Sequence, residues 1–258
     1  MKNGTKYAKL MKDEFKKLLK QESRPTQPEP TDPLDQLLLG ILARGATETQ
    51  AIDAMKKINE ATVDRNELRV AAPRELLELW GKQFPAALDK ARSINEMLNA
   101  VFDREHNLDL KRLRDMKKSD ARDYLLSLPG TDPHTVASTM LLSIGGHAIP
   151  VDDTMLAYFR QQNLVDPDAN VSEVQAFLER NVAAADGYAF YAMMRSHAAR
   201  GLARTGDAKN APAKSSKNTA GKTTARKPAA ASSTPAGKPA SKAPSKPAGK
   251  KTKKKERP

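Results

Sequence analysis

The sequence predicts an all-α body followed by a disordered basic C-terminal tail. Apolar residues repeat at helical spacing in one segment after another up to about residue 204, and no run alternates over the length of a strand. After Leu202 the chain contains no Leu, Ile, Val, Met, Phe, Tyr or Trp. A segment without large apolar side chains cannot build a core, so we expect residues 205–258 to be disordered.

The helices are predicted in order from apolar spacing and from start and stop signals. The first runs from Tyr7 to Leu19 over a basic opposite face, and four prolines between Ser23 and Pro33 end it. The second begins after Asp32 and Pro33 and continues to Leu42, and Thr47 with Gln50 has the spacing of a capping box that opens the third. Apolar periodicity predicts further helices over residues 76–80, 87–102, 121–128, 133–144, 154–162, 171–182 and 188–202.

The positive charge is concentrated in the tail. The formal net charge is +13, and residues 207–258 alone carry 15 Lys and Arg against two acids, so the body is neutral overall. Release of counterions from a phosphate backbone favours binding of such a polycation to nucleic acid. We expect DNA contacts from the terminal cluster Lys250, Lys251, Lys253, Lys254 and Lys255. A purely solubilising extension is the alternative.

The composition also excludes several classes of site. Cysteine is absent, which rules out disulfides, thiolate zinc sites and iron–sulfur clusters held by cysteine. No cofactor or metal is expected, and His147 and His197 are predicted to have structural or surface roles. The first twenty residues lack the apolar core of a secretory signal, and no stretch approaches the length of a membrane span. We expect a monomeric cytoplasmic protein with no membrane partner.

The most informative stretch is a predicted helical hairpin. One helix ends at Leu128, the turn is made by Pro129, Gly130 and Thr131, and the next helix begins with Asp132 as its N-cap and proline in its first turn. Such a turn presents backbone N–H groups at a helix N-terminus, where a DNA phosphate can accept hydrogen bonds.

The order of these segments resembles one family. LPGTDPHTVAS at residues 128–138, followed by VDDT at 151–154, is similar to the signature LPGVGxKTA followed by VDTH of the helix-hairpin-helix base-excision DNA glycosylase superfamily, of the endonuclease III-like type. Further segments that resemble helices of this family are residues 32–49, 71–80, 88–94, 171–182 and 193–200. The resemblance covers about residues 30–200 and includes neither the iron–sulfur cluster nor the catalytic lysine.

The resemblance implies a two-lobed fold with the site between the lobes. The implied divisions are an N-terminal helix and linker at 1–34 that pack with the second lobe, a helical bundle with the hairpin at 35–148, a C-terminal helical lobe at 149–204, and the tail at 205–258.

The resemblance also implies a catalytic carboxylate. Asp152 matches the essential aspartate of the family, because a carboxylate beside the sugar stabilises the positive charge that develops when an N-glycosidic bond breaks. Asp153 is adjacent and could take its place, and either residue could simply cap the following helix. His134 stands at the position of the family's lysine, and because imidazole cannot form a Schiff base, AP lyase activity is doubtful.

At two positions this sequence differs from the family's pattern in a way that affects the implied DNA contacts. Asp132 replaces the second hairpin glycine, and its carboxylate can satisfy the helix amides and repel a phosphate. Gly45 replaces a glutamine that fills the gap left by a flipped base. The DNA contacts implied for the body are at Pro129, Gly130, Thr131, Asp132, His134, Thr135 and Gly45. The sequence thus predicts a monofunctional DNA N-glycosylase acting on double-stranded DNA, and the alternative is a catalytically silent DNA-binding protein anchored by its tail.

Overall fold

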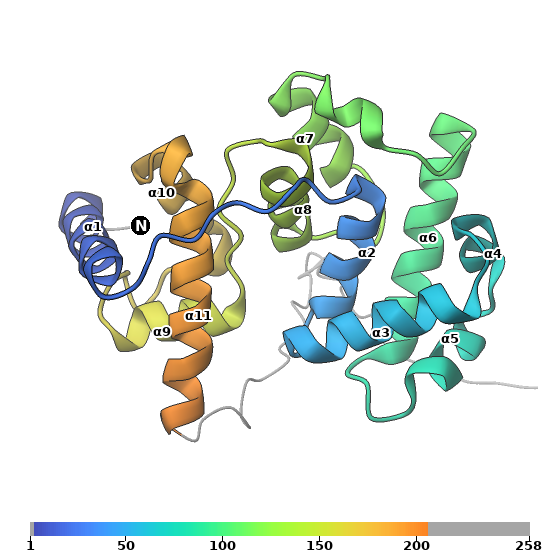
Figure 1. The fold of residues 1–258 in the computed structure, drawn as a ribbon, viewed down its shortest axis with the longest axis horizontal. Coiled ribbons are helices and arrows are strands. Elements are labelled where there is room, and N and C mark those ends of the chain that lie inside the picture. The colour runs from blue at the N-terminus through green and yellow to red at the C-terminus, as the bar shows by residue number, and fades with distance from the viewer. Residues whose placement is uncertain (1–2, 206–258) are drawn as a thin grey trace, which may run out of the picture. The chain divides into compact units, whose positions relative to one another are not determined.

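The protein is built from helices joined by short turns (Figure 1). The computed structural model describes residues 3–205, with side chains described as far as Gly201. The helices are α1 (Gly4–Gln21), α2 (Pro33–Ala43), α3 (Glu48–Ala61), α4 (Arg65–Val70), α5 (Pro73–Trp80), α6 (Ala87–Glu105), α7 (Lys118–Leu126), α8 (Pro133–Thr139), α9 (Asp153–Gln161), α10 (Val171–Asn181) and α11 (Gly187–Thr205). Short turns of 3₁₀ helix, η1 (Lys111–Arg114) and η3 (Ala184–Asp186), and a π-helical turn, η2 (Met140–Ile144), complete the set. The all-α prediction is confirmed.

The predicted helices agree with the observed ones to within a few residues, and the capping box of Thr47 and Gln50 is present. Helix α4 and the turn η1 were not predicted, because six and four residues are too short to show apolar periodicity. Apart from Thr205, which ends α11, the predicted tail lies outside the described residues, and so do its lysines 250, 251, 253, 254 and 255.

Two groups of helices meet around the candidate site. In Figure 1, helices α2 to α8 lie on one side, and α1, α9, α10 and α11 lie on the other. Helix α2 packs against α3, α6 and α8, while α11 packs against α9 and α1. Phe15 of α1 and Phe190 of α11 make an edge-to-face ring contact with centroids 5.3 Å apart. The lobe boundaries at residues 34 and 148 stay predictions.

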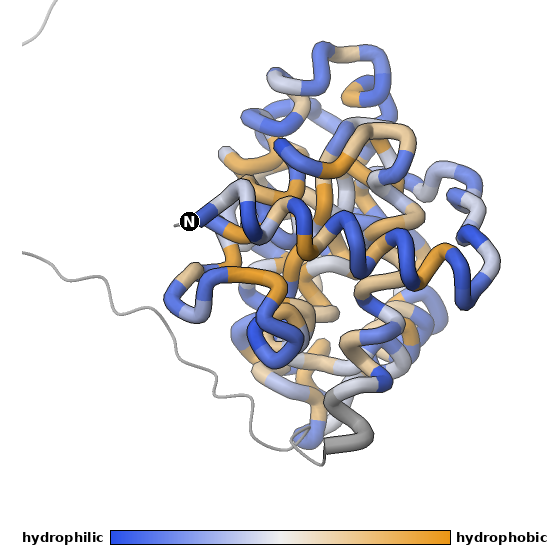
Figure 2. The backbone as a smooth tube through the Cα atoms, turned by 90° about the vertical axis from the view of Figure 1, so that its left-hand side faces the viewer, coloured by the Kyte–Doolittle hydropathy of each residue, from blue (hydrophilic) through white to orange (hydrophobic). Residues whose placement is uncertain are grey.

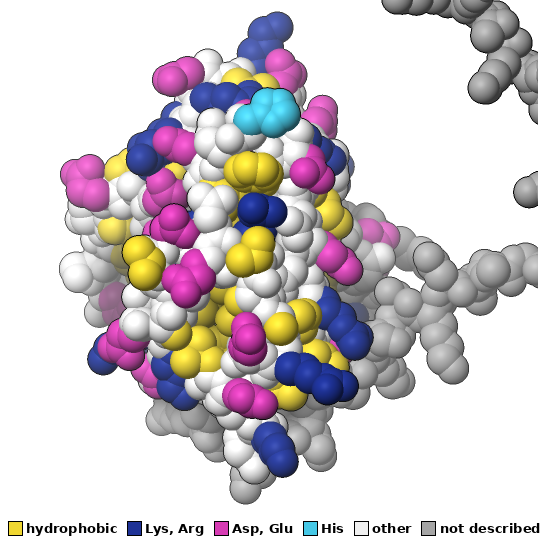
Figure 3. Space-filling view, turned by 90° about the vertical axis from the view of Figure 1, so that its right-hand side faces the viewer, with side chains coloured by type: hydrophobic (Ala, Val, Ile, Leu, Met, Phe, Trp, Pro, Cys, Tyr) yellow, Lys and Arg dark blue, Asp and Glu magenta, His cyan; other side chains and the backbone are white. Residues whose placement is uncertain are grey.

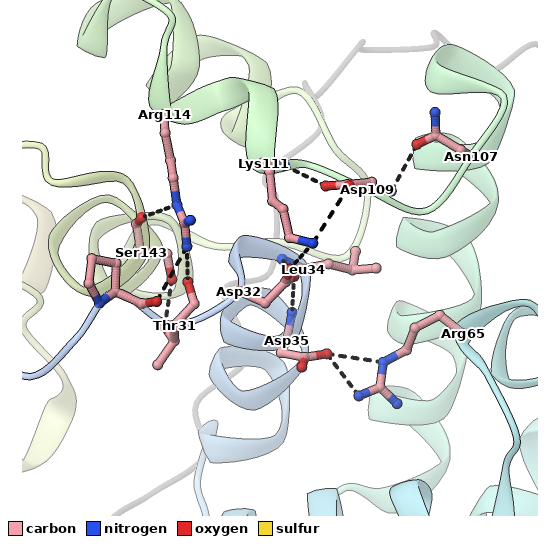
Figure 4. A network of polar contacts seen from close by, with 11 residues as sticks. Thr31, Asp32, Leu34, Asp35, Arg65, Asn107, Asp109, Lys111, Arg114 and Ser143 are labelled. Atoms are coloured by element: carbon pink, nitrogen blue, oxygen red, sulfur yellow. Dashed lines mark hydrogen bonds and ion pairs between the residues drawn. The ribbon is translucent and has the colours of Figure 1, made fainter.

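The linker between α1 and α2 is hydrogen-bonded to η2, the turn that follows α8. The backbone N–H of Thr31 donates to Leu142 O at 3.2 Å, and Gln27 Nε2 donates to Leu141 O at 3.0 Å. Arg114 Nε donates to Ser143 O at 3.0 Å, and its Nη2 donates to Thr31 O at 2.8 Å (Figure 4). The donors to Leu141, Leu142 and Ser143 satisfy carbonyl groups at the end of a helical segment, and Arg114 also binds Thr31 O, so the linker is held where it enters α2.

Among the described residues, no helix has the length and apolar character needed to cross a membrane.

Candidate active site and DNA interface

The hairpin between α7 and α8 has a glycine at its closest approach to α6. Thr131 Oγ1 donates to Leu128 O at 2.8 Å, which closes the end of α7. Gly130 has φ +74°, and a Cβ placed on it would lie 2.5 Å from Ser93 O. Because both the backbone angle and the contact exclude a larger residue, Gly130 fixes the position of the turn. Pro129 is exposed at its tip.

Asp132 caps α8, as predicted. Its Oδ1 accepts from Thr135 N at 2.9 Å, and its Oδ2 accepts from Thr135 Oγ1 at 3.0 Å and lies 3.6 Å from Arg44 Nε. Thr135 is fully buried, and its methyl group lies where α2 passes most closely, at Gly40. The amide of Thr135 is therefore already hydrogen-bonded, and a phosphate at this helix start would compete with a carboxylate that belongs to the protein.

Gly45 lies in the exposed turn after α2. It has φ +61°, and no atom lies within 4 Å of the point where a Cβ would stand. The turn leaves open space at this position. At the end of α2, before this turn, Leu42 O accepts a hydrogen bond at 2.7 Å from the ammonium of the buried Lys90, which lies 4.1 Å from the centre of the Phe84 ring. Burial, together with the smaller effect of the nearby Arg44 charge, lowers the pKa of Lys90 to about 8.

Asp152 is the N-cap of α9 and is half-buried. Its Oδ1 accepts from Met155 N at 2.7 Å. Within residues 3–205, no hydrogen bond reaches its other oxygen, Oδ2. Asp153 is the first residue of α9 and is exposed. The capping role foreseen as an alternative for Asp152 is present, but it uses only one of the two carboxylate oxygens.

A cavity of about 100 Å³ lies between α2, α3 and α8 on one side and α11 on the other. Its polar lining comes from Gln36, Glu48, His134, Ser138, Tyr191 and Arg195. Arg195 Nη1 donates to Tyr191 Oη at 2.6 Å, and Nη2 lies 3.6 Å from Glu48 Oε2. His134 Nε2 is buried and has no hydrogen-bond partner among the described residues.

The charges around this cavity act on one another. Burial lowers the pKa of His134, and the negative charges of Asp152 and Asp132 oppose this shift without cancelling it. The imidazole is therefore neutral at pH 7. Burial alone would lower the pKa of Arg195, but the interactions with Tyr191, Glu48 and Asp152 outweigh it and raise the pKa. Burial raises the pKa of Tyr191, and the negative charge of Asp152 raises it as well. Asp152 thus acts on three groups of the cavity wall.

The structure brings several predicted residues together and adds others. Asp132, His134 and Asp152 are close enough to interact electrostatically. Tyr191 and Arg195 were not singled out from the sequence, although their i, i+4 spacing places both on one face of α11. A larger hollow of about 270 Å³ beside Arg24 and Tyr188 lies away from these groups.

The two histidines that the sequence assigned to structural or surface roles contact carboxylate or carbonyl groups. His147 Nε2 lies 2.7 Å from Glu179 O, and His197 Nε2 lies 3.2 Å from Glu22 Oε1. No group of three His, Asp or Glu side chains in the described part of the chain is placed to hold a metal ion.

Solved structures place this architecture among known folds. No family model matches the sequence, and no curated protein matches it. A trapped covalent intermediate of endonuclease III with DNA is similar with a TM-score of 0.60 and 19% identity, over 76% of this chain and 86% of that one. The Clostridium acetobutylicum 8-oxoguanine glycosylase/lyase bound to double-stranded DNA has a TM-score of 0.61 and 15% identity, over 78% of this chain and 71% of that one.

The H. pylori 3-methyladenine DNA glycosylase bound to 1,N6-ethenoadenine is also similar, with a TM-score of 0.56 and 13% identity, over 76% of this chain and 98% of that one. All three similarities extend over three quarters or more of this chain, so they include both groups of helices around the cavity. The chain therefore has the fold of the helix-hairpin-helix DNA glycosylases, as its sequence predicted.

Proposed function

We propose that this protein is a monofunctional DNA N-glycosylase of base-excision repair. The observation that carries the proposal is the carboxylate of Asp152, which caps α9 with one oxygen, leaves the other without a hydrogen bond among the described residues, and acts electrostatically on the His134, Tyr191 and Arg195 side chains of the cavity wall. The proteins with the same fold that were solved with DNA or a modified base support the choice of substrate.

The proposed reaction is hydrolysis of one N-glycosidic bond. The damaged nucleotide rotates out of the duplex, and its base enters the cavity lined by His134, Tyr191 and Arg195. As the bond between C1′ and the base nitrogen breaks, the bonding electrons leave with the base and positive charge develops on the sugar. The carboxylate of Asp152 stabilises that charge. A water oxygen then bonds to C1′, and the released proton neutralises the departing base, which leaves an abasic site.

Strand cleavage does not follow in this scheme. A lyase step needs an amine that attacks C1′ to form a Schiff base. His134 offers a neutral imidazole at the position where the resemblance places a lysine. Lys90 is an amine with a lowered pKa, but it is 2% exposed and bound to Leu42 O. We therefore propose base release without lyase activity, by a monomer acting on double-stranded DNA in the cytoplasm.

A second candidate function is DNA binding without catalysis. Asp132 favours it, because this carboxylate occupies the Thr135 amide that a phosphate would otherwise use. In that case the fold would serve as a scaffold, and the basic residues 207–258 would anchor the protein on DNA.

One experiment separates the two candidates. The full-length protein is incubated with a panel of duplexes that each carry one modified base, and alkali then reveals abasic sites as strand breaks. We expect breaks in at least one duplex after alkali and none before it, and no covalent adduct after treatment with borohydride. Binding without base release across the panel would support the silent protein, and a trapped adduct would contradict the absence of a lyase amine.

A further inference from the structure

Helix α1 presents a row of lysines to solvent. Six lysines lie between Gly4 and Gln21, and all six are exposed, while Met11, Phe15 and Leu18 on the opposite face are buried. Lys6, Lys9, Lys16 and Lys20 follow one another at intervals of three, seven and four residues, which return to the same side of an α-helix. Figure 2 looks onto the side of the molecule where α1 lies and shows hydrophilic and hydrophobic residues alternating along it.

Few acidic groups interrupt this row. Helix α1 contains two acids: Glu14 is paired with Lys17 at 3.3 Å, and the exposed Asp13 lies within the row, four residues after Lys9 and three before Lys16. Within residues 3–205, no ion pair involves Lys9, Lys12, Lys16 or Lys20. The opposite side of the molecule differs, because Lys and Arg there are interspersed with Asp and Glu (Figure 3). The body is neutral overall, whereas α1 carries six lysines against two acids, a local excess of four positive charges.

We infer that the solvent face of α1, defined by Lys6, Lys9, Lys12, Lys16, Lys17 and Lys20, is a phosphate-binding surface for duplex DNA, separate from the hairpin. From Lys6 to Lys20 the row extends about 21 Å at 1.5 Å per residue. Phosphates follow one another at about 3.4 Å of rise along one DNA strand, so the row is as long as about six phosphates.

The apolar side of α1 determines which polyanion fits. A helix that binds a membrane surface inserts its apolar face among the lipids. In α1 this face is buried: Phe15 packs on Phe190, and Met11 and Leu18 are 3% and 2% exposed. Leu10 is 37% exposed, but the other side chains that α1 exposes to solvent are polar or charged, so the helix has no continuous apolar face for a lipid surface. The choice of DNA among polyanions rests on the proposed function, which brings the protein onto a duplex whose hairpin contact is weakened by Asp132.

Salt-dependent binding of the full-length protein to one short undamaged duplex tests the inference. The variant Lys9→Gln/Lys16→Gln/Lys20→Gln removes three charges from the α1 face. The matched control Lys57→Gln/Arg74→Gln/Lys82→Gln removes three exposed charges from the region of α3 and α5. Each phosphate contact contributes about −0.9 to the slope of log affinity against log salt. We expect the slope of the α1 variant to become shallower by about two to three, and that of the control to stay unchanged.

A charge-conserving variant and a vesicle-binding measurement complete the experiment. Lys9→Arg/Lys16→Arg/Lys20→Arg keeps the charge and should keep the slope, including in the event that the glutamine variant folds poorly. An unchanged slope, or the same loss in the α1 variant and the control, overturns the inference. Loss of binding to phosphatidylserine vesicles with an unchanged DNA slope also overturns it, in favour of a lipid surface.

The same variants separate this inference from the proposed function. Base release from a modified duplex should be the same in wild type and in the control variant Lys57→Gln/Arg74→Gln/Lys82→Gln, whose residues lie outside the proposed surface. Should wild type release no base, the proposed function fails, whereas a shallower slope in the α1 variant alone would still support the lysine surface.

Discussion

Helices α8 and α9 both begin at an aspartate N-cap, and the two carboxylates are used differently. At the start of α8, both oxygens of Asp132 accept hydrogen bonds from Thr135, and Oδ2 also lies 3.6 Å from Arg44 Nε. At the start of α9, Asp152 accepts one hydrogen bond, from Met155 N at 2.7 Å. Capping requires only one carboxylate oxygen. When the second oxygen is also hydrogen-bonded within the protein, the carboxylate has only a structural role, and when it is not, the carboxylate can still interact with a ligand.

The residue three positions after each cap explains the difference. Thr135 supplies a backbone amide and a hydroxyl, and both reach Asp132. Met155 supplies only its amide, because its thioether has no proton to donate. The sequences DPHT and DDTM therefore leave the two capping carboxylates with different numbers of oxygens free to accept further hydrogen bonds, although both helices begin with an aspartate N-cap.

The largest expected effect comes from Asp152→Asn. We expect base release to fall by about 10²- to 10³-fold, the loss typical of removing one group that stabilises transition-state charge. The melting temperature should change little, because Asn caps a helix about as well as Asp. DNA affinity should stay the same or rise, since a negative charge is removed. Single-turnover excision assays and thermal unfolding measure both.

Asp153→Asn is the matched control for this substitution, because Asp153 is adjacent and exposed. Its effect on base release should be much smaller. Equal losses in both variants, together with lower melting temperatures, would assign both carboxylates to the fold alone.

Asp132→Gly should act in the opposite direction on DNA. It removes a carboxylate from the hairpin, leaves the Thr135 amide available to a phosphate and frees Arg44 from its ion pair. We expect affinity for an undamaged duplex to rise by about tenfold, which corresponds to about 1.4 kcal/mol. The free energy of unfolding should fall by only a few tenths of a kcal/mol from loss of the cap, because glycine is itself well tolerated at an N-cap. Unchanged or weaker binding would mean that phosphates do not approach the start of α8.

Thr135→Val isolates the second oxygen of Asp132. Valine nearly reproduces the shape of threonine against Gly40 but has no hydroxyl, so Asp132 keeps its capping bond and loses the bond from Oγ1. We expect the free energy of unfolding to fall by about 0.5–1.5 kcal/mol, the net value of one hydrogen bond. Urea unfolding measures it. A loss well above this range would show that the packing at Gly40 dominates.

The fold could be predicted further than the site. The helices, the Asp132 cap and the hairpin turn follow from local apolar spacing and from Pro, Gly and Asp signals, which are properties of neighbouring residues. Tyr191 and Arg195 line the cavity only because α11 lies across it from α3 and α8. The pattern of neighbouring residues in the sequence does not predict this arrangement of helices. The free oxygen of Asp152 is likewise visible only once its neighbours are placed.

The smallest expected effect is a shift in the titration of His134, whose pKa responds to both caps. Burial lowers this pKa below its usual value of about 6.5, and the charge of Asp152, followed by that of Asp132, opposes the shift. As pH falls below about 6.5, the unfolded chain therefore takes up a proton before the folded one, so His134 reduces the free energy of unfolding only below that pH. Above it the effect is absent. Because Asp152 acts more strongly, Asp152→Asn should lower the pKa of His134 further than Asp132→Asn does. NMR titration of the imidazole, with His134→Gln to assign its signal, measures both shifts. A larger shift in Asp132→Asn would mean that the hairpin carboxylate, and not the proposed catalytic one, dominates the field at the cavity wall.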